Sequence, residues 1–97
     1  MYANVRSRKF KPGKVAEAAK QIEANVVPMV SQVPGFISFT LAQTGENQIT
    51  IMGLFENQAA AEQAGPKAIA WVDENLGDWV DGPAVVTNGP VLVYHKK

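Results

Sequence analysis

Two stretches of this sequence carry apolar residues at spacings of three and four, the period of an amphipathic helix. The first stretch consists of Val15, Ala18, Ala19, Ile22, Val26, Met29, Val30 and Val33. The second consists of Ala61, Ala64, Ala68, Trp71, Val72, Leu76 and Trp79. Each helix buries only one face, so both need a surface to cover, and the extended segments around them can supply it as a sheet.

The extended segments are marked off by turn signals. Proline and glycine stand together at Pro12-Gly13 and Pro34-Gly35, and the polar loop Thr44–Asn47 joins two branched and aromatic runs as a β-hairpin. The predicted strands are residues 2–10, 36–43, 48–55 and 84–94. Both helices on one side of a four-stranded antiparallel sheet, in the order β-α-β-β-α-β, make a ferredoxin-like α+β two-layer sandwich. We expect residues 1–97 to form a single domain.

Proline and glycine also fall inside two predicted elements. Gly65-Pro66 lies within the second apolar stretch and predicts an interrupted helix, with a longer piece starting near Pro66. Asn88-Gly89-Pro90 lies within the last strand and indicates a bulge or an edge position.

Both faces of the hairpin strands are apolar. Ile37, Phe39 and Leu41 share one parity of the first hairpin strand, whereas the second carries Ile51 on one parity and Met52 on the other. Two helices can cover only one face of the sheet. Leaving the other side chains in water would forgo roughly 1.5–3 kcal/mol each. The pattern therefore predicts a homodimer in which two sheets face each other.

Composition excludes several classes of protein. Nine basic residues balance nine acidic ones, which gives no support for nucleic-acid binding. The sequence has no cysteine, which excludes thiol chemistry and favours a cytoplasmic location. No apolar run is long enough to span a membrane, and residues 1–6 do not form a signal peptide. A single histidine, His95, stands near the C-terminus, and no metal-ligand spacing is found.

One face of the first strand is polar. Tyr2, Asn4, Arg6 and Arg8 share one parity, and this strand is central in the predicted topology. A buried arginine is costly without a partner, so Arg6 either lines a wet pocket or pairs with an acid on a helix. We expect Arg8 at the rim. Trp71 and Trp79 lie on the second helical stripe; both fit a core role, although an indole N–H beside a polar pocket could also meet a ligand.

The sequence resembles the antibiotic biosynthesis monooxygenase (ABM) family over essentially its whole length. The residues that carry the resemblance are Lys11-Pro12-Gly13-Lys14, Val33-Pro34-Gly35-Phe36, residues 53–62, residues 68–76, Gly82-Pro83 and Asn88-Gly89-Pro90-Val91. These motifs mostly mark turns and the ends of helices and strands, so they are more specific for the fold than for a reaction. The resemblance implies a dimeric α+β barrel, in agreement with the two apolar sheet faces.

The resemblance also implies a range of activities. Some relatives oxidise polycyclic phenols with molecular oxygen and no cofactor, in a pocket lined by asparagine, tryptophan and arginine. Here it implies that Arg6 stabilises a substrate anion, Asn4 orients the substrate and Trp71 forms an aromatic wall, with Tyr2 and Trp79 as further contacts. Other relatives degrade haem through a histidine on the second helix, which this sequence lacks.

Two functions are consistent with this sequence. The first is a cofactor-independent monooxygenase that acts on a small aromatic or phenolic compound. The second is a non-catalytic small-ligand-binding or stress-related dimer on the same fold. An open pocket lined by Asn4 and Arg6 would favour the first function, and a closed apolar interior with Arg6 tied to an acid would favour the second.

Overall fold

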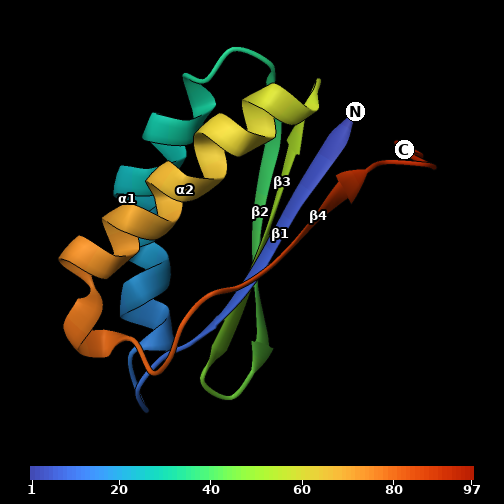
Figure 1. Ribbon diagram of the computed structural model, residues 1–97. Coiled ribbons are helices and arrows are strands. Elements are labelled where there is room, and N and C mark those ends of the chain that lie inside the picture. Colours follow the sequence, from blue (N-terminus) through green and yellow to red (C-terminus); the bar gives the residue numbers. More distant parts are fainter.

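The protein folds into two layers, with both helices on one face of an antiparallel sheet (Figure 1). The computed structural model describes residues 1–97, with the elements β1 (Tyr2–Lys9), α1 (Val15–Ser31), β2 (Phe36–Gly45), β3 (Gln48–Phe55), α2 (Gln58–Asn75), the 3₁₀ turn η1 (Gly77–Trp79) and β4 (Val85–Pro90). The strands lie in the order β2-β3-β1-β4. This is the predicted ferredoxin-like topology, with β1 in a central position.

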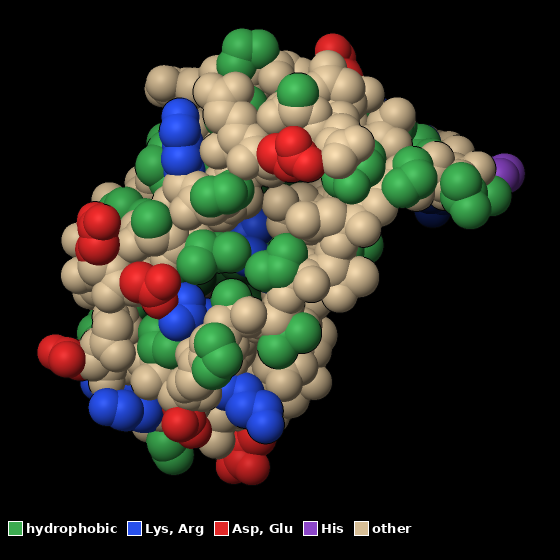
Figure 2. All heavy atoms as spheres, in the orientation of Figure 1, with side chains coloured by type: hydrophobic (Ala, Val, Ile, Leu, Met, Phe, Trp, Pro, Cys, Tyr) green, Lys and Arg blue, Asp and Glu red, His purple; other side chains and the backbone are tan.

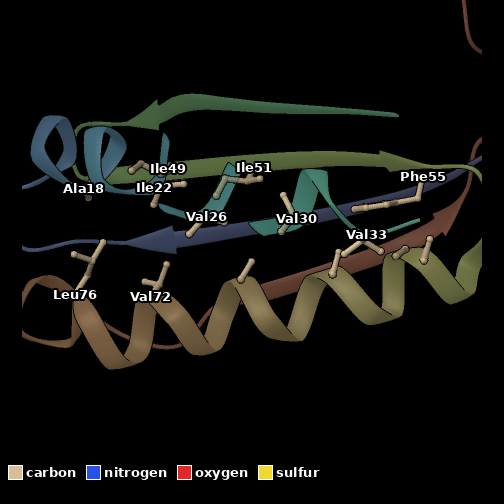
Figure 3. Close-up of a cluster of buried hydrophobic side chains, with 14 of the residues drawn as sticks. Ala18, Ile22, Val26, Val30, Val33, Ile49, Ile51, Phe55, Val72 and Leu76 are labelled. Atoms are coloured by element: carbon tan, nitrogen blue, oxygen red, sulfur yellow. The ribbon is translucent and has the colours of Figure 1, made fainter. Parts of the chain in front are cut away.

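The core lies between the helices and the inner face of the sheet. Ile22 and Val26 of α1, Ile51 and Phe55 of β3, and Val72 of α2 point toward one another there (Figure 3). Helix α1 packs mainly on β2, and α2 packs on β1 and β3. The helix-side face of the edge strand β4 stays open to solvent, and its Val86 is 44% exposed. This gap positions the candidate site.

Helix α2 is continuous, so the predicted interruption at Gly65-Pro66 is wrong. Pro66 removes one backbone donor, but both Pro66 and Glu62, whose carbonyl loses that donor, are exposed and can be solvated. The stripe also ends earlier than predicted, because Trp79 belongs to η1 and not to the helix. Neither helix combines the length and the apolar character needed to span a membrane.

A bulge changes the parity of the first hairpin strand. The register shifts between Phe36 and Ser38, so Phe36 pairs with Phe55 and packs with Phe39 against the core. Ile37 does not share the core position of Phe39 that strict alternation predicts, and it is 39% exposed. Because the bulge inserts one extra residue into the strand, Phe36 and Phe39 both face the core although they differ in parity.

Strand β4 is shorter than the predicted residues 84–94. It ends at Pro90, and the backbone N–H of Val91 donates one more hydrogen bond to the carbonyl of Met1 at 2.9 Å. Pro90 has no N–H to add to the ladder, which fits an edge strand. Beyond this point the chain leaves the sheet edge, as the C-terminal segment in Figure 1 shows.

Candidate active site

An open groove lies between α2 and β4, where the helix layer stops short of the sheet edge. Its volume is about 280 Å³, and it is lined by Asn4, Ala61, Glu62, Gly65, Pro66, Ile69, Val86 and Asn88. In the view of Figure 2 the surface is hollowed along the boundary between these two elements. The groove approaches the size of sites that bind small molecules, which begin at roughly 300 Å³.

Two buried polar side chains of β1 mark this region: Asn4 lines the groove, and Arg6 lies next to Asn4 on the same strand face. Asn4 is 3% exposed and Arg6 is 9% exposed, and they are the only buried polar or charged residues of the protein. Nη1 of Arg6 donates a hydrogen bond to Oδ1 of Asn4 at 3.4 Å. Nδ2 of Asn4 donates to the carbonyl of Ala61 on α2, also at 3.4 Å. Both bonds are long, so the pair is held only loosely.

Gly65 makes this arrangement possible. A Cβ atom at position 65 would overlap Nδ2 of Asn4, so only glycine lets α2 approach β1 this closely while the Asn4 amide stays in place. Glycine weakens the interior of a helix by about 1 kcal/mol relative to alanine. The sequence accepts that cost at the one point where α2 crosses Asn4.

The Arg6 guanidinium has no acidic partner. The only salt bridge in the protein joins Arg8 to Asp73, and the one side-chain hydrogen bond of Arg6 goes to Asn4. Desolvation by burial lowers the pKa of Arg6 well below the ordinary arginine value, to about 10. Arg6 therefore stays charged at neutral pH, as a buried cation without a counter-ion beside an open groove.

The second arginine of this strand face is paired. Nη2 of Arg8 lies 2.6 Å from Oδ1 of Asp73 on α2, and its Nε donates to the carbonyl of Gly82 at 3.1 Å. Arg8 therefore fastens the C-terminal half of α2 and the following loop to β1. The ion pair with a helix acid, which the sequence allowed for Arg6, is made by Arg8 instead.

A second, narrower pocket, partly open to solvent, lies beside the groove, between the sheet and α2. Its volume is about 20 Å³, which is room for roughly one water-sized molecule. Seven apolar side chains line it, together with Arg6 and Arg8. Ile69 lines both this narrow pocket and the groove, so the two spaces adjoin.

The aromatic residues expected at the site lie elsewhere. Trp71, Tyr2 and Trp79 are half-buried and pack against the core, and none of them lines the groove or the narrow pocket. The ring of Trp79 lies beneath Lys14, with 5.1 Å between Nζ and the ring centroid. On α2 it is Ile69, not Trp71, that faces the groove.

Of the eight residues that line the groove, sequence reasoning names only Asn4 as a candidate for the site. Val86 and Asn88 enter through the β1–β4 register, in which Asn88 lies directly opposite Asn4. The rotation of α2 about its own axis turns the side chain of Ile69 toward the groove. The glycine at position 65 was a visible signal, because an isolated glycine inside a helical pattern often marks a close contact.

The groove offers few groups for acid–base chemistry. Its one carboxylate, Glu62, is exposed and accepts a hydrogen bond from Gln58 at 2.8 Å. His95 lies in the exposed C-terminal segment. Nowhere do three or more His, Cys, Asp or Glu side chains gather so that they could hold a metal ion. The site can bind an anion and supply hydrogen-bond donors, but it has no evident base.

Comparison with known proteins decides the family. The model of the antibiotic biosynthesis monooxygenase family matches residues 1–65 of this chain. The chain belongs to this family. The match includes Asn4, Arg6 and Gly65, but it stops before Ile69, Val86 and Asn88.

Solved structures share the fold over nearly the full chain. A protein of unknown function from Nitrosomonas europaea has a TM-score of 0.78 and 18% identity, with 99% of this chain and 93% of that chain covered. A monooxygenase from Streptomyces coelicolor, solved in complex with nanaomycin D, has a TM-score of 0.75 and 18% identity, with 99% and 92% covered. A conserved protein from Methanosarcina mazei has a TM-score of 0.73 and 16% identity, with 99% and 92% covered. At these identities the likeness is one of fold.

One curated relative matches part of the sequence. A mitochondrial Lon protease homolog from Eremothecium gossypii is 39% identical over an alignment of 59 residues that covers 56% of this chain. The chain spans only 6% of the length of that protease. A likeness of this extent supports no shared activity.

Proposed function

We propose that this protein, as one ABM domain over residues 1–97, is a cofactor-independent monooxygenase of a small aromatic or phenolic compound. The observation that carries the proposal is the unpaired Arg6 guanidinium, buried beside an open groove. A buried charge without a partner reduces stability, and an anionic ligand would compensate it. The cytoplasm is the predicted location, as the cysteine-free sequence favours.

Five side chains in or beside the groove have a role in this proposal. Arg6 binds the ionised oxygen of the ligand, and a hydrogen bond to a charged group contributes about 1.5–3 kcal/mol. Asn4 and Asn88 orient neighbouring oxygens of the ligand. Ile69 and Val86 flank the ring, in the place that the resemblance gave to Trp71. Dioxygen then oxidises a ring C–H of the bound phenolate to a quinone carbonyl, and its second oxygen atom leaves as water with that hydrogen and one proton from solvent, so that the substrate itself supplies all the electrons.

The absence of a buried base from the groove narrows the substrate. Arg6 is a cation below a pH of about 10, and Glu62 is solvated, so neither is placed to take a phenol proton inside the groove. The preferred substrates are therefore phenols or enols acidic enough to be ionised near neutral pH. Examples are nitrophenols and hydroxylated quinones.

The experiment is a matched ligand panel measured in two ways. Acidic phenols, hydroxynaphthoquinones and their O-methyl ethers are titrated by calorimetry, and oxygen uptake is followed with an electrode. We expect the ionised compounds to bind at least tenfold more tightly than their ethers and some of them to consume oxygen. Equal affinity for anions and ethers would remove the role of Arg6, and uptake no faster than the buffer reaction would remove the monooxygenase.

The second function, ligand binding without oxidation, is favoured by that same lack of a proton acceptor in the groove. It predicts the same selectivity for anions in calorimetry without oxygen uptake. The panel therefore separates the two functions in one set of samples.

We also propose that the working unit is a homodimer formed through the outer face of the sheet. Three cross-strand rows form the middle of this face, with Lys9 at its end: Gly89, Ala3, Leu54 and Ser38; Thr87, Val5, Met52 and Thr40; and Val85, Ser7, Thr50 and Ala42. None of the side chains in these rows is charged, and most are small. A face that stays in water usually carries charges, whereas small uncharged rows let two sheets approach closely. A second copy is the occupant, because the face matches itself about a twofold axis.

The dimer is tested at Met52, which is 45% exposed on this face. Met52→Asp should yield a monomer in sedimentation and remove the concentration dependence of the unfolding midpoint. Ile51 is not a suitable position, because its side chain faces the helices and a charged residue there would disrupt the core. Ala16→Asp, on the exposed side of α1, is the control and should stay dimeric. Unmodified protein that sediments as a monomer at micromolar concentration would exclude the dimer.

A further inference from the structure

Helix α2 carries two helix-weakening residues, Gly65 and Pro66, in the wall of the groove. Glycine and proline are the two residue types that disfavour a helix interior most. Gly65 is explained by the close approach of Asn4, whereas Pro66 is exposed and its packing does not explain it. The helix continues through both residues, so Pro66 removes a hydrogen bond from α2 without ending it.

The missing hydrogen bond leaves a backbone carbonyl without its helical donor at the groove. Within a helix each N–H donates to the carbonyl four residues earlier, and proline has no N–H to donate. The carbonyl concerned belongs to Glu62, and Glu62 and Pro66 both line the groove. The carbonyl of the preceding residue, Ala61, accepts a hydrogen bond from Nδ2 of Asn4 at 3.4 Å. Backbone acceptors of this helical turn are therefore within reach of polar groups in the groove.

A free acceptor in a binding site selects among ligands. Solvent can hydrate the Glu62 carbonyl, because both Glu62 and Pro66 are exposed. A ligand that covers this carbonyl excludes solvent from it, and an acceptor that is buried without a donor costs free energy. A ligand with its own N–H or O–H group replaces the solvent and avoids that cost. Such a site discriminates against the analogue that lacks the donor.

We propose that Pro66 determines specificity: by freeing the Glu62 carbonyl, it makes the groove select aromatic anions that carry a second N–H or O–H group on the ring. Arg6 donates hydrogen bonds and the carbonyl only accepts them, so the preferred ligand presents an acceptor to the one and a donor to the other. This inference rests on the proposed function for its aromatic anion. It concerns binding alone, and it is tested without turnover.

The test is a calorimetric cycle of paired ligands and paired proteins. The ligands are nitrophenolates with an amino group ortho, meta or para to the ionised oxygen, and each is compared with its dimethylamino derivative, which has no N–H. In at least one pair we expect the unmodified protein to bind the amino compound about tenfold more tightly. Pro66→Ala restores the helical N–H, so the ratio of the two affinities should fall by about the same factor. The bulk of the methyl groups is common to both proteins and cancels.

The proline of the other helix provides a matched control. Pro28 lies inside α1, which is also continuous, and it removes the helical donor of the Ala24 carbonyl. Both residues are exposed, and neither lines the groove. Pro28→Ala should therefore leave the affinity ratio unchanged. A ratio that falls as far in Pro28→Ala as in Pro66→Ala would make the effect a general one of helix stability, and the proposal would fail.

A spectroscopic measurement identifies the accepting oxygen. The NMR signal of a carbonyl carbon moves downfield when its oxygen accepts a hydrogen bond, and the backbone carbonyl of Glu62 is observed through the amide of Gln63. We expect the amino ligand to move this signal and the dimethylamino ligand to leave it in place. If the N–H preference disappears in Glu62→Ala, which retains the backbone carbonyl, the side-chain carboxylate is the acceptor and the proposal is overturned.

The outcomes separate this inference from the proposed function. An N–H preference that depends on Pro66, without oxygen uptake, would remove the monooxygenase and leave the specificity of the groove. Anions that bind with no N–H preference, or with the same preference in Pro66→Ala, would overturn the inference and leave the proposed function. If no compound of the panel binds, both fail.

Discussion

The two edges of the helix layer each leave a groove over the sheet, and the grooves differ in chemistry more than in size. The groove between α1 and β2 is the larger, about 380 Å³ against about 280 Å³ for the groove between α2 and β4. Its floor is formed by Phe39 and Leu41, and its charges, Lys20 and Glu23, are exposed on the rim. The smaller groove instead is lined by Asn4, with Arg6 hydrogen-bonded to Asn4 beside it, and both are buried.

The difference shows what marks a site in this fold. Any two-layer sandwich leaves space where round helices meet a flat sheet edge, so volume alone does not identify a binding site. A solvated lysine such as Lys20 costs the fold nothing, whereas a desolvated guanidinium without a counter-ion costs stability. The α2–β4 groove is the one at which this sequence accepts such a cost.

The largest expected effect comes from removing the cation beside each groove in turn, Arg6 for the α2–β4 groove and Lys20 for the α1–β2 groove. Arg6→Met keeps the length of the side chain and removes its charge, so anion binding should weaken by about 1.5–3 kcal/mol, roughly tenfold to hundredfold in Kd. The same change should raise the free energy of unfolding by up to about 3 kcal/mol, because the lowered pKa of Arg6 reflects the cost of burying that charge. Calorimetry and urea unfolding measure the two effects.

The control for this prediction lies in the other groove. Lys20→Met should change neither affinity nor stability by more than about 0.5 kcal/mol, because its charge is solvated. An Arg6→Met protein that is less stable and binds anions as before would make Arg6 an ordinary structural residue. The two grooves would then be equivalent.

The second prediction concerns the close approach of α2 to the groove floor. Gly65→Ala puts a methyl group where Nδ2 of Asn4 lies, so Asn4 or the helix must move. We expect a loss of about 1–3 kcal/mol in stability, as in other overpacked sites, together with weaker ligand binding. Gly77→Ala meets no atom within 4 Å and serves as the control. If Gly65→Ala stabilises the protein through its better helix propensity, the tight contact with Asn4 is not important.

The sequence allowed prediction of the strand face that carries the site, but not of its neighbours. Alternation along residues 2–9 placed Asn4 and Arg6 on one face, and the element order made that strand central; both are confirmed. Which arginine pairs with an acid depends on the position of each arginine along β1 relative to the residues of α2. The period of the sequence pattern does not give that position. The stripe of α2 fits either Trp71 or Ile69 toward the groove, since the two are only two residues apart. Asn88 comes opposite Asn4 only through the register of β4, which depends on the long connection before it.

The smallest expected effect is the dependence of binding on alkaline pH. A nitrophenol that is fully ionised above pH 8.5 isolates the protein's own titration. Arg6 binds the anion in its protonated form, and burial holds its pKa at about 10 in the free protein. Affinity should therefore be flat from pH 8.5 to about 9.5, then fall about twofold at pH 10 and about tenfold at pH 11.

Above a pH of about 10 the free energy of unfolding changes in the opposite direction to the ligand affinity. The pKa of Arg6 is lower in the folded protein than in the unfolded chain, so above a pH of about 10 the unfolded chain holds more protons and folding is favoured as pH rises. The stability advantage of Arg6→Met over the unmodified protein should therefore shrink above pH 10, while all shared lysines and tyrosines cancel in the difference. Calorimetric titrations and urea unfolding of both proteins at matched pH measure the two trends. A fall in affinity of the same size in Arg6→Met would assign the titration to another group, and the α2–β4 groove would lose the property that separates it from the groove beside α1.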